Sequence, residues 1–402
     1  MRFGPVRLRA EGLPEHGHSV YLHLEARGLR EIAPADEPPR AEISVGWVDM
    51  LSWTRQPAMS SAESLHSLAE RARRGGITHL FVGGWTGWHD PSVLAQVRAE
   101  VESLPVWIHC LATWATPEGY LAPVESLRLE GAAGWTLPPH QSIPWRTLVQ
   151  ALPYLRHLGG VLLVLPFWEA APGEMGVSET PLLALSGWRG IPEWAESIAI
   201  HALAALHQAY GGRMLIGPLT SAAGHKIACD YGLSSFTTIS YLIAHAGELL
   251  AYDPFWKLHP PLRGPEDQRA LAEAAFQGQL HVASGDILAP PEEKNLEWTA
   301  AAIGQPTVDA FAPLLWKVGS QFDSGGKAVS KLVWLLSEMP RRFLGLAPFK
   351  VEVGMPLDFT VFRIEENSYD LPPPWNKYSS TLRVMGTIRS LADAYNLQSQ
   401  MS

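Results

Sequence analysis

The chain has very little cysteine. Cys110 and Cys229 are the only two cysteines in 402 residues, and each lies among apolar or small residues. Two cysteines so far apart do not provide the disulfide framework that small secreted domains need, and they fit reduced thiols in a reducing compartment. We therefore expect a cytoplasmic protein without structural disulfides.

The chain also lacks blocks of one charge and long apolar runs. It has 31 basic residues against 40 acidic ones, a formal net charge of −9, and the basic residues do not cluster. The longest apolar run, residues 161–168, is far too short to cross a bilayer, and the first residues contain no apolar signal segment. We therefore expect neither a nucleic acid nor a membrane as a partner.

Three motifs of common enzyme classes are missing from the sequence. There is no Gly-x-Gly-x-x-Gly fingerprint at the start of a helix, no Walker A motif and no Gly-x-Ser-x-Gly nucleophile elbow. The first two motifs hold phosphates at helix N-termini, and the third exposes a nucleophilic serine. Nucleotide binding and serine hydrolase chemistry therefore have no support in the sequence.

The chain does contain a repeated alternation of apolar strands and amphipathic helices. Strands are expected at 78–82, 106–111, 160–165, 213–217, 235–241 and 281–284, and helices at 144–158, 192–210 and 266–277. Repeated β–α units over roughly 300 residues favour parallel strands, and a (β/α)8 barrel is the commonest closed arrangement at that length. We therefore predict an α/β fold with a TIM-type (β/α)8 barrel.

Both ends of the chain have a different pattern. Residues 1–45 alternate short strand-like pieces with polar turns, and short strands return at 358–362 and 381–388. Short alternating segments with turn residues between them are typical of β domains. We therefore predict a small β-sandwich domain formed by residues 1–45 and 350–402, and a barrel domain formed by residues 46–349.

Several segments match the order and spacing of one enzyme family. They are Val-Gly-Trp-Val-Asp at 45–49, Arg-Gly-Gly-Ile-Thr at 74–78, Gly-Ile-Pro-Glu-Trp-Ala-Glu-Ser-Ile-Ala at 190–199, His-Pro-Pro-Leu-Arg at 259–263, Pro-Glu-Glu-Lys at 291–294 and Leu-Asp-Phe-Thr-Val-Phe at 357–362. They resemble the PGLVD, GGVT, GIPxxAExIA, NPPLR, PEEK and ADLTVF segments of the dihydroorotase branch of the amidohydrolase superfamily. The resemblance implies a barrel flanked by a β-sandwich from both chain ends, and zinc-dependent hydrolysis of a cyclic amide.

The metal-ligand positions of that family hold other residues in this chain. Where the family has Asp-x-His-x-His-x-Arg on the first strand, this chain has Leu51 and Trp53 at the two histidine positions. By the same resemblance, the bridging acidic position falls near Leu137, and the later histidine positions fall near Phe167 and at Pro218. Side chains without lone pairs cannot hold a divalent cation, so we expect no zinc or other cofactor and assign no metal ligand.

Four polar or aromatic positions of the family site remain as candidates. Asp286 matches the last acidic ligand, as a vestigial catalytic group for proton transfer, and the alternative is a carboxylate that caps a loop or pairs with a cation. Arg55 matches the arginine that binds the substrate carboxylate, and the alternative is an ion pair inside the barrel mouth. Trp85 and His259 stand where the family has asparagines, so Arg55, His259 and Trp85 are the candidate substrate-binding residues.

The chain is rich in tryptophan, with 16 residues. Trp53 and Trp85, together with Phe167, fall on or near strand ends that should face the barrel mouth. Bulky aromatic side chains at these positions either fill the former cavity or form a stacking platform for a ligand. Filling is the more common role of such residues, and we expect it here.

Together these residues predict a catalytically inactive dihydroorotase-like protein. The resemblance implies that such inactive homologues associate with aspartate carbamoyltransferase in pyrimidine biosynthesis, as structural or regulatory partners in a homo-oligomer or hetero-oligomer. One alternative is an enzyme, an active dihydroorotase or related cyclic-amide hydrolase, with a rebuilt or metal-free site around Asp286, Arg55 and His259. A further alternative is a sensor whose Trp-lined pocket binds a carboxylated ring without reaction.

Overall fold

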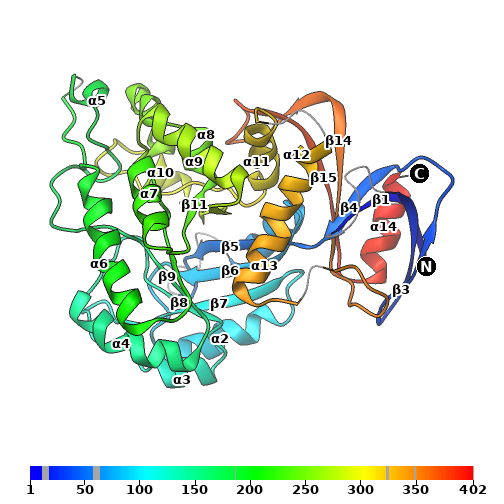
Figure 1. Ribbon diagram of the computed structural model, residues 1–402, viewed down its shortest axis with the longest axis horizontal. Coiled ribbons are helices and arrows are strands. Elements are labelled where there is room, and N and C mark those ends of the chain that lie inside the picture. The colour runs from blue at the N-terminus through cyan, green and yellow to red at the C-terminus, as the bar shows by residue number, and fades with distance from the viewer. Residues whose placement is uncertain (11–17, 58–63, 186, 323–325, 348–349, 402) are drawn as a thin grey trace.

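The computed structural model describes residues 1–10, 18–57, 64–185, 187–322, 326–347 and 350–401. Its larger part consists of parallel strands around a common axis with helices outside them (Figure 1). In chain order the strands are β5 (Trp47–Thr54), β6 (Ile77–Gly84), β7 (Trp107–Thr113), β8 (Gly134–Thr136), β9 (Val161–Val164), β10 (Met214–Ile216), β11 (Phe236–Thr238), β12 (His281–Ala283) and β13 (Asp286–Ile287). They are mostly buried because helices cover them outside and side chains of opposite strands cover them inside.

The strands close into a barrel. Parallel pairing runs without interruption from β10 through β9, β8, β7, β6 and β5 to β13. The strand β12, which leads into β13, pairs in parallel with β11, and a bridge between Ile216 and Ser235 connects β10 to the start of β11. The described residues thus form a complete circle of eight strand positions, with β12 and β13 counted as one. The predicted (β/α)8 fold class is confirmed.

Helices follow the strands around the barrel. They are α1 (Leu65–Arg74), α2 (Pro91–Val101), α3 (Val124–Leu129), α4 (Trp145–Leu158), α5 (Pro181–Leu185), α6 (Trp194–Tyr210), α7 (Ala222–Asp230), α8 (Ile239–Ile243), α9 (Pro265–Gln277), α10 (Pro291–Lys294), α11 (Phe311–Gly319), α12 (Gly326–Val333) and α13 (Met339–Leu344), with the short turns η1 (Ala246–Ala251) and η2 (Pro254–Trp256) and the π-helical η3 (Trp334–Glu338). The helices predicted at 144–158, 192–210 and 266–277 are α4, α6 and α9. In the described part of the chain, no helix is both long and apolar enough to cross a membrane.

The helix α1 shows why these segments are helical. Ser64 caps its first turn by accepting a hydrogen bond from the backbone N–H of Ser67 at 3.0 Å. Leu65, Leu68 and Ala72 recur every three or four residues on one face and are buried against the barrel. The cap satisfies a free N–H group, and the apolar face supplies most of the stability of the helix through packing.

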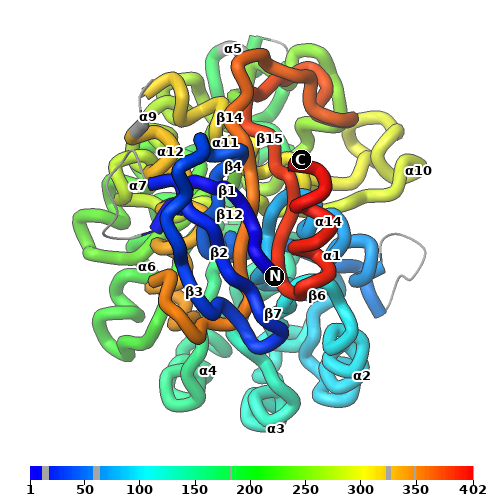
Figure 2. Tube along the Cα trace, turned by 90° about the vertical axis from the view of Figure 1, so that its right-hand side faces the viewer, coloured from blue at the N-terminus to red at the C-terminus, as the bar shows by residue number. Residues whose placement is uncertain are grey.

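The two chain ends form a second β structure. Its strands are β1 (Arg2–Arg9), β2 (Ser19–Glu25), β3 (Gly28–Pro34), β4 (Ala41–Val45), β14 (Phe359–Asp370) and β15 (Ser379–Ile388), joined in one sheet in the order β15-β14-β4-β1-β2-β3. A helix that the sequence pattern did not predict, α14 (Leu391–Met401), packs on this sheet (Figure 2). The expected β domain from both ends is therefore present as one sheet with a helix on it. The predicted domain boundaries stay a prediction, and residue 349 lies outside the described residues.

A buried ion pair connects the barrel to this sheet. Asp358, just before β14, contacts Arg341 Nη2 at 2.5 Å and His79 Nε2 at 3.1 Å. His79 Nδ1 in turn lies 3.0 Å from His109 Nε2. Burial would raise the pKa of Asp358, but hydrogen bonding to His79 and the charge of Arg341 outweigh it, so this pKa lies well below its usual range. A buried charge needs such partners, which therefore determine how the barrel meets the sheet.

His281 on β12 predicts how stability depends on pH. Its side chain is buried, and burial lowers its pKa from 6.5 to about 4. The unfolded chain therefore binds a proton between these values while the folded protein does not. The stability contribution of the neutral imidazole is present above pH 6.5 and lost as the pH falls towards 4. We expect the change from about pH 8 to about pH 5 to lower the free energy of unfolding by about 2 kcal/mol through His281.

The variant His281→Gln isolates this effect because glutamine does not titrate. Urea unfolding at both pH values should show that acidification lowers the free energy of unfolding less in the variant than in the wild type. The exposed histidine His66 provides a control, and His66→Gln should leave the wild-type loss unchanged. Equal losses in wild type and His281→Gln would contradict the prediction.

Candidate functional site

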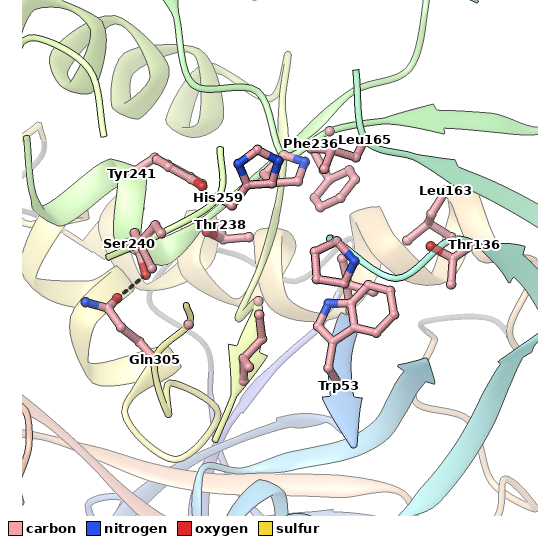
Figure 3. A pocket seen from close by; sticks show the side chains of 18 of the residues that line it. Trp53, Thr136, Leu163, Leu165, Phe236, Thr238, Ser240, Tyr241, His259 and Gln305 are labelled. Carbon is pink, nitrogen blue, oxygen red and sulfur yellow. Dashed lines mark hydrogen bonds between the residues drawn. The ribbon is translucent and has the colours of Figure 1, made fainter. Parts of the chain in front are cut away.

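The carboxyl ends of the barrel strands enclose a small cavity (Figure 3). Its free space is about 50 Å³. The apolar lining includes Leu51, Trp53, Leu137, Pro139, Leu163, Leu165, Pro218, Phe236, Leu258 and Ile287, and the polar lining includes Thr136, Thr238, Ser240, Tyr241, His259 and Gln305. Pockets for drug-sized ligands usually measure about 300–1,000 Å³, so this cavity is far smaller than such a site.

Trp53 fills much of the space between the strand ends. Figure 3 shows its ring pointing into the region bounded by Phe236, Leu163 and Thr136. Gly83 on the neighbouring strand β6 makes room for the ring, because a Cβ atom there would lie 2.6 Å from Cζ3 of Trp53. The tryptophan is only 5% exposed. This close fit is that of a packed core residue.

The positions at which the family resemblance places metal ligands meet at this cavity. Four of them line it, namely Leu51, Trp53, Leu137 and Pro218. Phe167 does not, because it lies nearer the surface against His259, while Leu165 of the same segment faces inward. The segment after β9 therefore presents a different residue to the cavity from the one that the sequence comparison indicated.

The lining does not fit a zinc ion. A protein zinc site needs three or four nitrogen, sulfur or oxygen ligands around one point. Among the described residues that line the cavity, His259 carries the single imidazole, and there is no cysteine or carboxylate. Within the described ranges, no group of three or more His, Cys, Asp or Glu side chains could hold a metal ion. The residues present thus do not match a metal centre of the family type.

Asp286 lies beside the cavity but faces away from it. Its neighbours Gly285 and Ile287 line the cavity, whereas its carboxylate is directed towards α1. There it accepts hydrogen bonds from Arg71 at 2.7 and 3.0 Å and from the backbone N–H groups of residues 307–308 at 2.5 and 2.9 Å. These contacts fit a carboxylate that pairs with a cation and caps a loop, and they do not fit a general base in the cavity.

Arg55 is held by a carboxylate of its own chain. It lies directly after β5, is 5% exposed, and its Nη1 contacts Glu293 Oε2 at 2.5 Å. Its guanidinium group also lies 5.3 Å from the centre of the Trp85 ring. Glu293 comes from α10, in the segment that resembles PEEK. It occupies Nη1 of Arg55, while Nε of the same guanidinium group is buried without a partner in the described structure, so the ion-pair alternative fits the contact at Nη1.

His259 is the one candidate binding residue that lines the inner cavity. It also lines a second cavity of about 210 Å³ nearer the surface, where its ring lies 4.7 Å from that of Phe167. Burial, and to a smaller extent the neighbouring His140, lower the pKa of His259 to about 4. Trp85 packs against His140 at 4.9 Å between ring centres. The structure therefore brings Arg55 and Trp85 together but leaves both outside the inner cavity.

One wall of the cavity was not predicted from the sequence. Ser240 donates a hydrogen bond to Gln305 at 2.7 Å, and Tyr241 donates to the carbonyl of Pro260 at 2.6 Å. Both residues belong to the apolar run 235–241, which predicted a strand. The structure instead ends β11 at Thr238 and begins α8 directly after it, so the polar side chains of α8 face the cavity.

A second buried carboxylate joins the first and last barrel strands. Asp49 on β5 accepts hydrogen bonds from the backbone N–H and the hydroxyl of Ser284, at 2.8 and 2.6 Å, and from the hydroxyl of Ser52 at 2.7 Å. Burial raises the pKa of Asp49 to about 6, although these hydrogen bonds act against the rise. With Asp286 on the other side, polar groups at this seam close the barrel and do not reach the cavity.

Removal of Arg71 should leave Asp286 buried without its cation. Breaking one side of a buried ion pair typically costs about 3–5 kcal/mol, so we expect Arg71→Met to lower the free energy of unfolding by about that amount. The exposed pair of Lys226 and Asp230 provides a control, and Lys226→Met should cost far less. Urea unfolding followed by circular dichroism measures both. Similar small decreases in the free energy of unfolding of the two variants would show that the buried carboxylate of Asp286 does not need Arg71 as its partner.

Removal of the Trp53 ring should leave a void that its rigid surroundings cannot close. We expect Trp53→Ala to lower the free energy of unfolding by about 3–5 kcal/mol, as other large-to-small core substitutions do. Trp194, which is 44% exposed, is the matched control, and Trp194→Ala should cost much less. If Trp53→Ala unfolds at the urea concentration of the control, Trp53 is not a packing residue.

The sequence relatives of this chain are named dihydroorotase or dihydroorotase-like protein. No protein-family model matches the chain. A putative dihydroorotase from Rhodopirellula baltica is 25% identical over 350 residues, which cover 79% of this chain and 72% of that protein. A dihydroorotase from Thermus aquaticus is 26% identical, covering 82% of this chain and 80% of that protein. A dihydroorotase-like protein from Pseudomonas aeruginosa is 25% identical, covering 85% of each.

Solved structures show the same fold. An L-hydantoinase (dihydropyrimidinase) from Arthrobacter aurescens has a TM-score of 0.79 at 16% identity, covering 96% of this chain and 94% of that chain. A dihydroorotase from Saccharomyces cerevisiae, in complex with 5-fluoroorotic acid, has a TM-score of 0.65 at 15% identity, covering 85% of this chain and 97% of that chain. Sequence relatives and motifs agree in their similarity to dihydroorotases, and the solved structures show that the chain has the fold of the hydantoinases and of dihydroorotase.

Proposed function

We propose that this protein is a catalytically inactive, dihydroorotase-like partner of aspartate carbamoyltransferase in pyrimidine biosynthesis. The observation that carries the inactive part is the cavity of about 50 Å³, in which Leu51, Trp53 and Pro218 stand at expected metal-ligand positions. Hydrolysis of a cyclic amide in this family depends on water activated by a metal. Apolar side chains supply neither the lone pairs nor the charge that would hold one.

Two charged groups near the cavity support the same proposal because each is already paired with a charged group of this chain. Arg55 pairs with Glu293, and Asp286 pairs with Arg71. A carboxylated ring that bound Nη1 of Arg55 would have to displace Glu293. Since Glu293 belongs to the same chain, its effective concentration at Arg55 is high, and a free ligand competes poorly.

The alternative is an active dihydroorotase or related hydrolase with a rebuilt site. Such a site would need Asp286, Arg55 and His259 around one reacting amide. Of these three, only His259 lines the cavity, and its neutral ring has no carboxylate within the described lining to orient it. The geometry therefore favours the inactive protein over the enzyme.

The association with the transferase rests on the resemblance to inactive homologues that bind this enzyme. The described structure supports a scaffold role, because the barrel is closed and the contact of Asp358 with Arg341 connects it to the β sheet although the cavity is filled. We propose a homo-oligomer or hetero-oligomer in the cytoplasm, where the free thiols of Cys110 and Cys229 would stay reduced.

The proposal is tested with the full-length chain and the aspartate carbamoyltransferase of the same organism. We expect a tagged chain to retain the transferase on an affinity column, and deletion of the chain to reduce transferase assembly or activity. We expect the purified chain to contain no stoichiometric zinc by mass spectrometry and to hydrolyse no dihydroorotate. Orotate and dihydroorotate should leave its tryptophan fluorescence unchanged because the cavity is too small for the ring of either compound.

Each part of the proposal can fail separately. Stoichiometric zinc together with turnover that is lost in Asp286→Ala would establish the hydrolase alternative. Quenching of the fluorescence by dihydroorotate, without turnover, would favour a sensor of carboxylated rings. A transferase that assembles and works unchanged without this chain would overturn the partnership.

A further inference from the structure

Apolar side chains are exposed at the rim of the barrel mouth. We define this rim patch by the exposed residues Leu185, Leu250, Tyr252 and Leu296, together with Trp188 and Trp298, which pack on the barrel core. Leu185 is 89% exposed, Tyr252 is 54% exposed, and Leu296 is 45% exposed. Single exposed apolar residues are ordinary on protein surfaces, but a contiguous group of them marks an interaction site.

The rim patch is continuous although it comes from three loops. The ring of Trp188, after α5, lies 5.2 Å from that of Tyr252 and 5.3 Å from that of Trp298, between ring centres. Trp188 thus connects the loop of α5 with the end of η1 and with the segment after α10. Figure 1 shows α5 at the outer tip of the barrel, far from the β sheet of the chain ends. One partner surface can therefore contact all three loops.

Two observations distinguish the rim patch from an ordinary surface. Tyr252 has a φ of 54°, and it is the single non-glycine residue with positive φ among the described residues. A bulky side chain in this left-handed conformation is strained, and such strain concentrates at binding sites. The indole N–H groups of Trp188 and Trp298 are buried and donate to no acceptor in the described structure, which is rare for buried donors.

The charge around the rim patch is predominantly negative. Glu179, Glu292 and Glu297 are exposed, and no ion pair within the described residues involves them. Asp253, next to Tyr252, is exposed as well. In the described parts of the same three loops, Arg189 is the single exposed basic residue. The rim patch is therefore an apolar surface surrounded by carboxylates.

The lysines of these loops do not offset this charge at the surface. Lys257 donates hydrogen bonds to the carbonyls of Trp298 and Ala301 at 2.6 and 2.8 Å. Lys294 donates to the carbonyls of Ala302 and Gly304 at 3.0 and 2.7 Å. Both ammonium groups hold the backbone after α10 in place, beneath the exposed side chains. The exposed cations near these loops in the described structure are Arg189 and Lys377, and Lys377 pairs with Glu248 of η1, so the unpaired glutamates still outnumber the basic residues that a partner meets.

We propose that the rim patch is a docking surface for a partner protein that presents apolar side chains surrounded by lysine or arginine. Leu185 and Tyr252 supply the apolar contact, and the surrounding glutamates attract and orient the basic residues. A second copy of this chain fits poorly, because the same patch would bring carboxylates against carboxylates. The inference rests on the proposed function in that it names the surface through which a partner is bound.

The first experiment uses a defined probe and needs no transferase. A fluorescently labelled peptide of leucine and lysine is titrated with the full-length chain, and a peptide of leucine and glutamate serves as the negative probe. We expect the basic peptide alone to bind, with an affinity that falls as salt concentration rises. Binding of both peptides alike, or of neither, would overturn the inference.

Two matched triple variants locate the binding. We expect Glu179→Lys, Glu292→Lys and Glu297→Lys together to weaken binding of the basic peptide at least about tenfold. The control carries the same charge change on α2, directly after it and on α3, with Glu100→Lys, Glu102→Lys and Glu125→Lys, all at exposed positions, and should bind like the wild type. Leu185→Ser should weaken binding without a change in net charge. Equal effects of the two triple variants would overturn the inference.

The second experiment separates this inference from the proposed function. Co-purification of the transferase is repeated with the wild type, the rim variant and the control variant, after circular dichroism has shown that each is folded. Loss of the transferase with the rim variant alone supports both proposals. Retention by all three proteins overturns the rim patch and leaves the proposed function standing. If the wild type retains no transferase, the proposed function fails, and the peptide titration decides the inference by itself.

Discussion

Closure of the barrel at the seam between β5 and the last strand is the interaction on which the rest of the structure depends. Asp49 binds Ser52 and Ser284 at this seam, and Asp286 binds Arg71 and two backbone N–H groups on its other side. Buried carboxylates are tolerated only when hydrogen bonds and cations satisfy them. Because their donors come from the neighbouring strand, from α1 and from the following loop, the two carboxylates hold these elements in one register.

The same seam explains why no carboxylate lines the cavity in the described structure. A hydrolytic barrel needs polar side chains that point from the strand ends into open space, and these are costly without a metal or substrate to satisfy them. In this chain the carboxylates of Asp49 and Asp286 are engaged in closure, and no carboxylate, lysine or arginine lies among the described residues that line the cavity. The space that remains is filled by Trp53, which the missing side chain of Gly83 accommodates. Closure and filling therefore stabilise the same state, in which the cavity is too small for a ring.

The sequence predicted the order of strands and helices because burial imposes a regular spacing on apolar residues, as in α4 and α6. It also predicted apolar residues at the former ligand positions, since Leu51 and Trp53 lie inside a motif of recognisable spacing. The direction of Asp286 could not be predicted, because a shift of one residue reverses the face of a strand. Nor could the pairing of Arg55 with Glu293, since 238 residues separate them and only the closed barrel brings them together.

The inside and the rim of the barrel mouth follow opposite physical rules. Inside, apolar side chains are packed and charges are paired, which lowers the free energy of the isolated chain. At the rim, Leu185 is exposed to water and Tyr252 holds a strained backbone, and both raise that free energy. Only a contact that covers these residues offsets this cost. In the proposed function the protein acts on other molecules through its surface, and the exposed rim is the part of that surface where a bound partner would offset this cost.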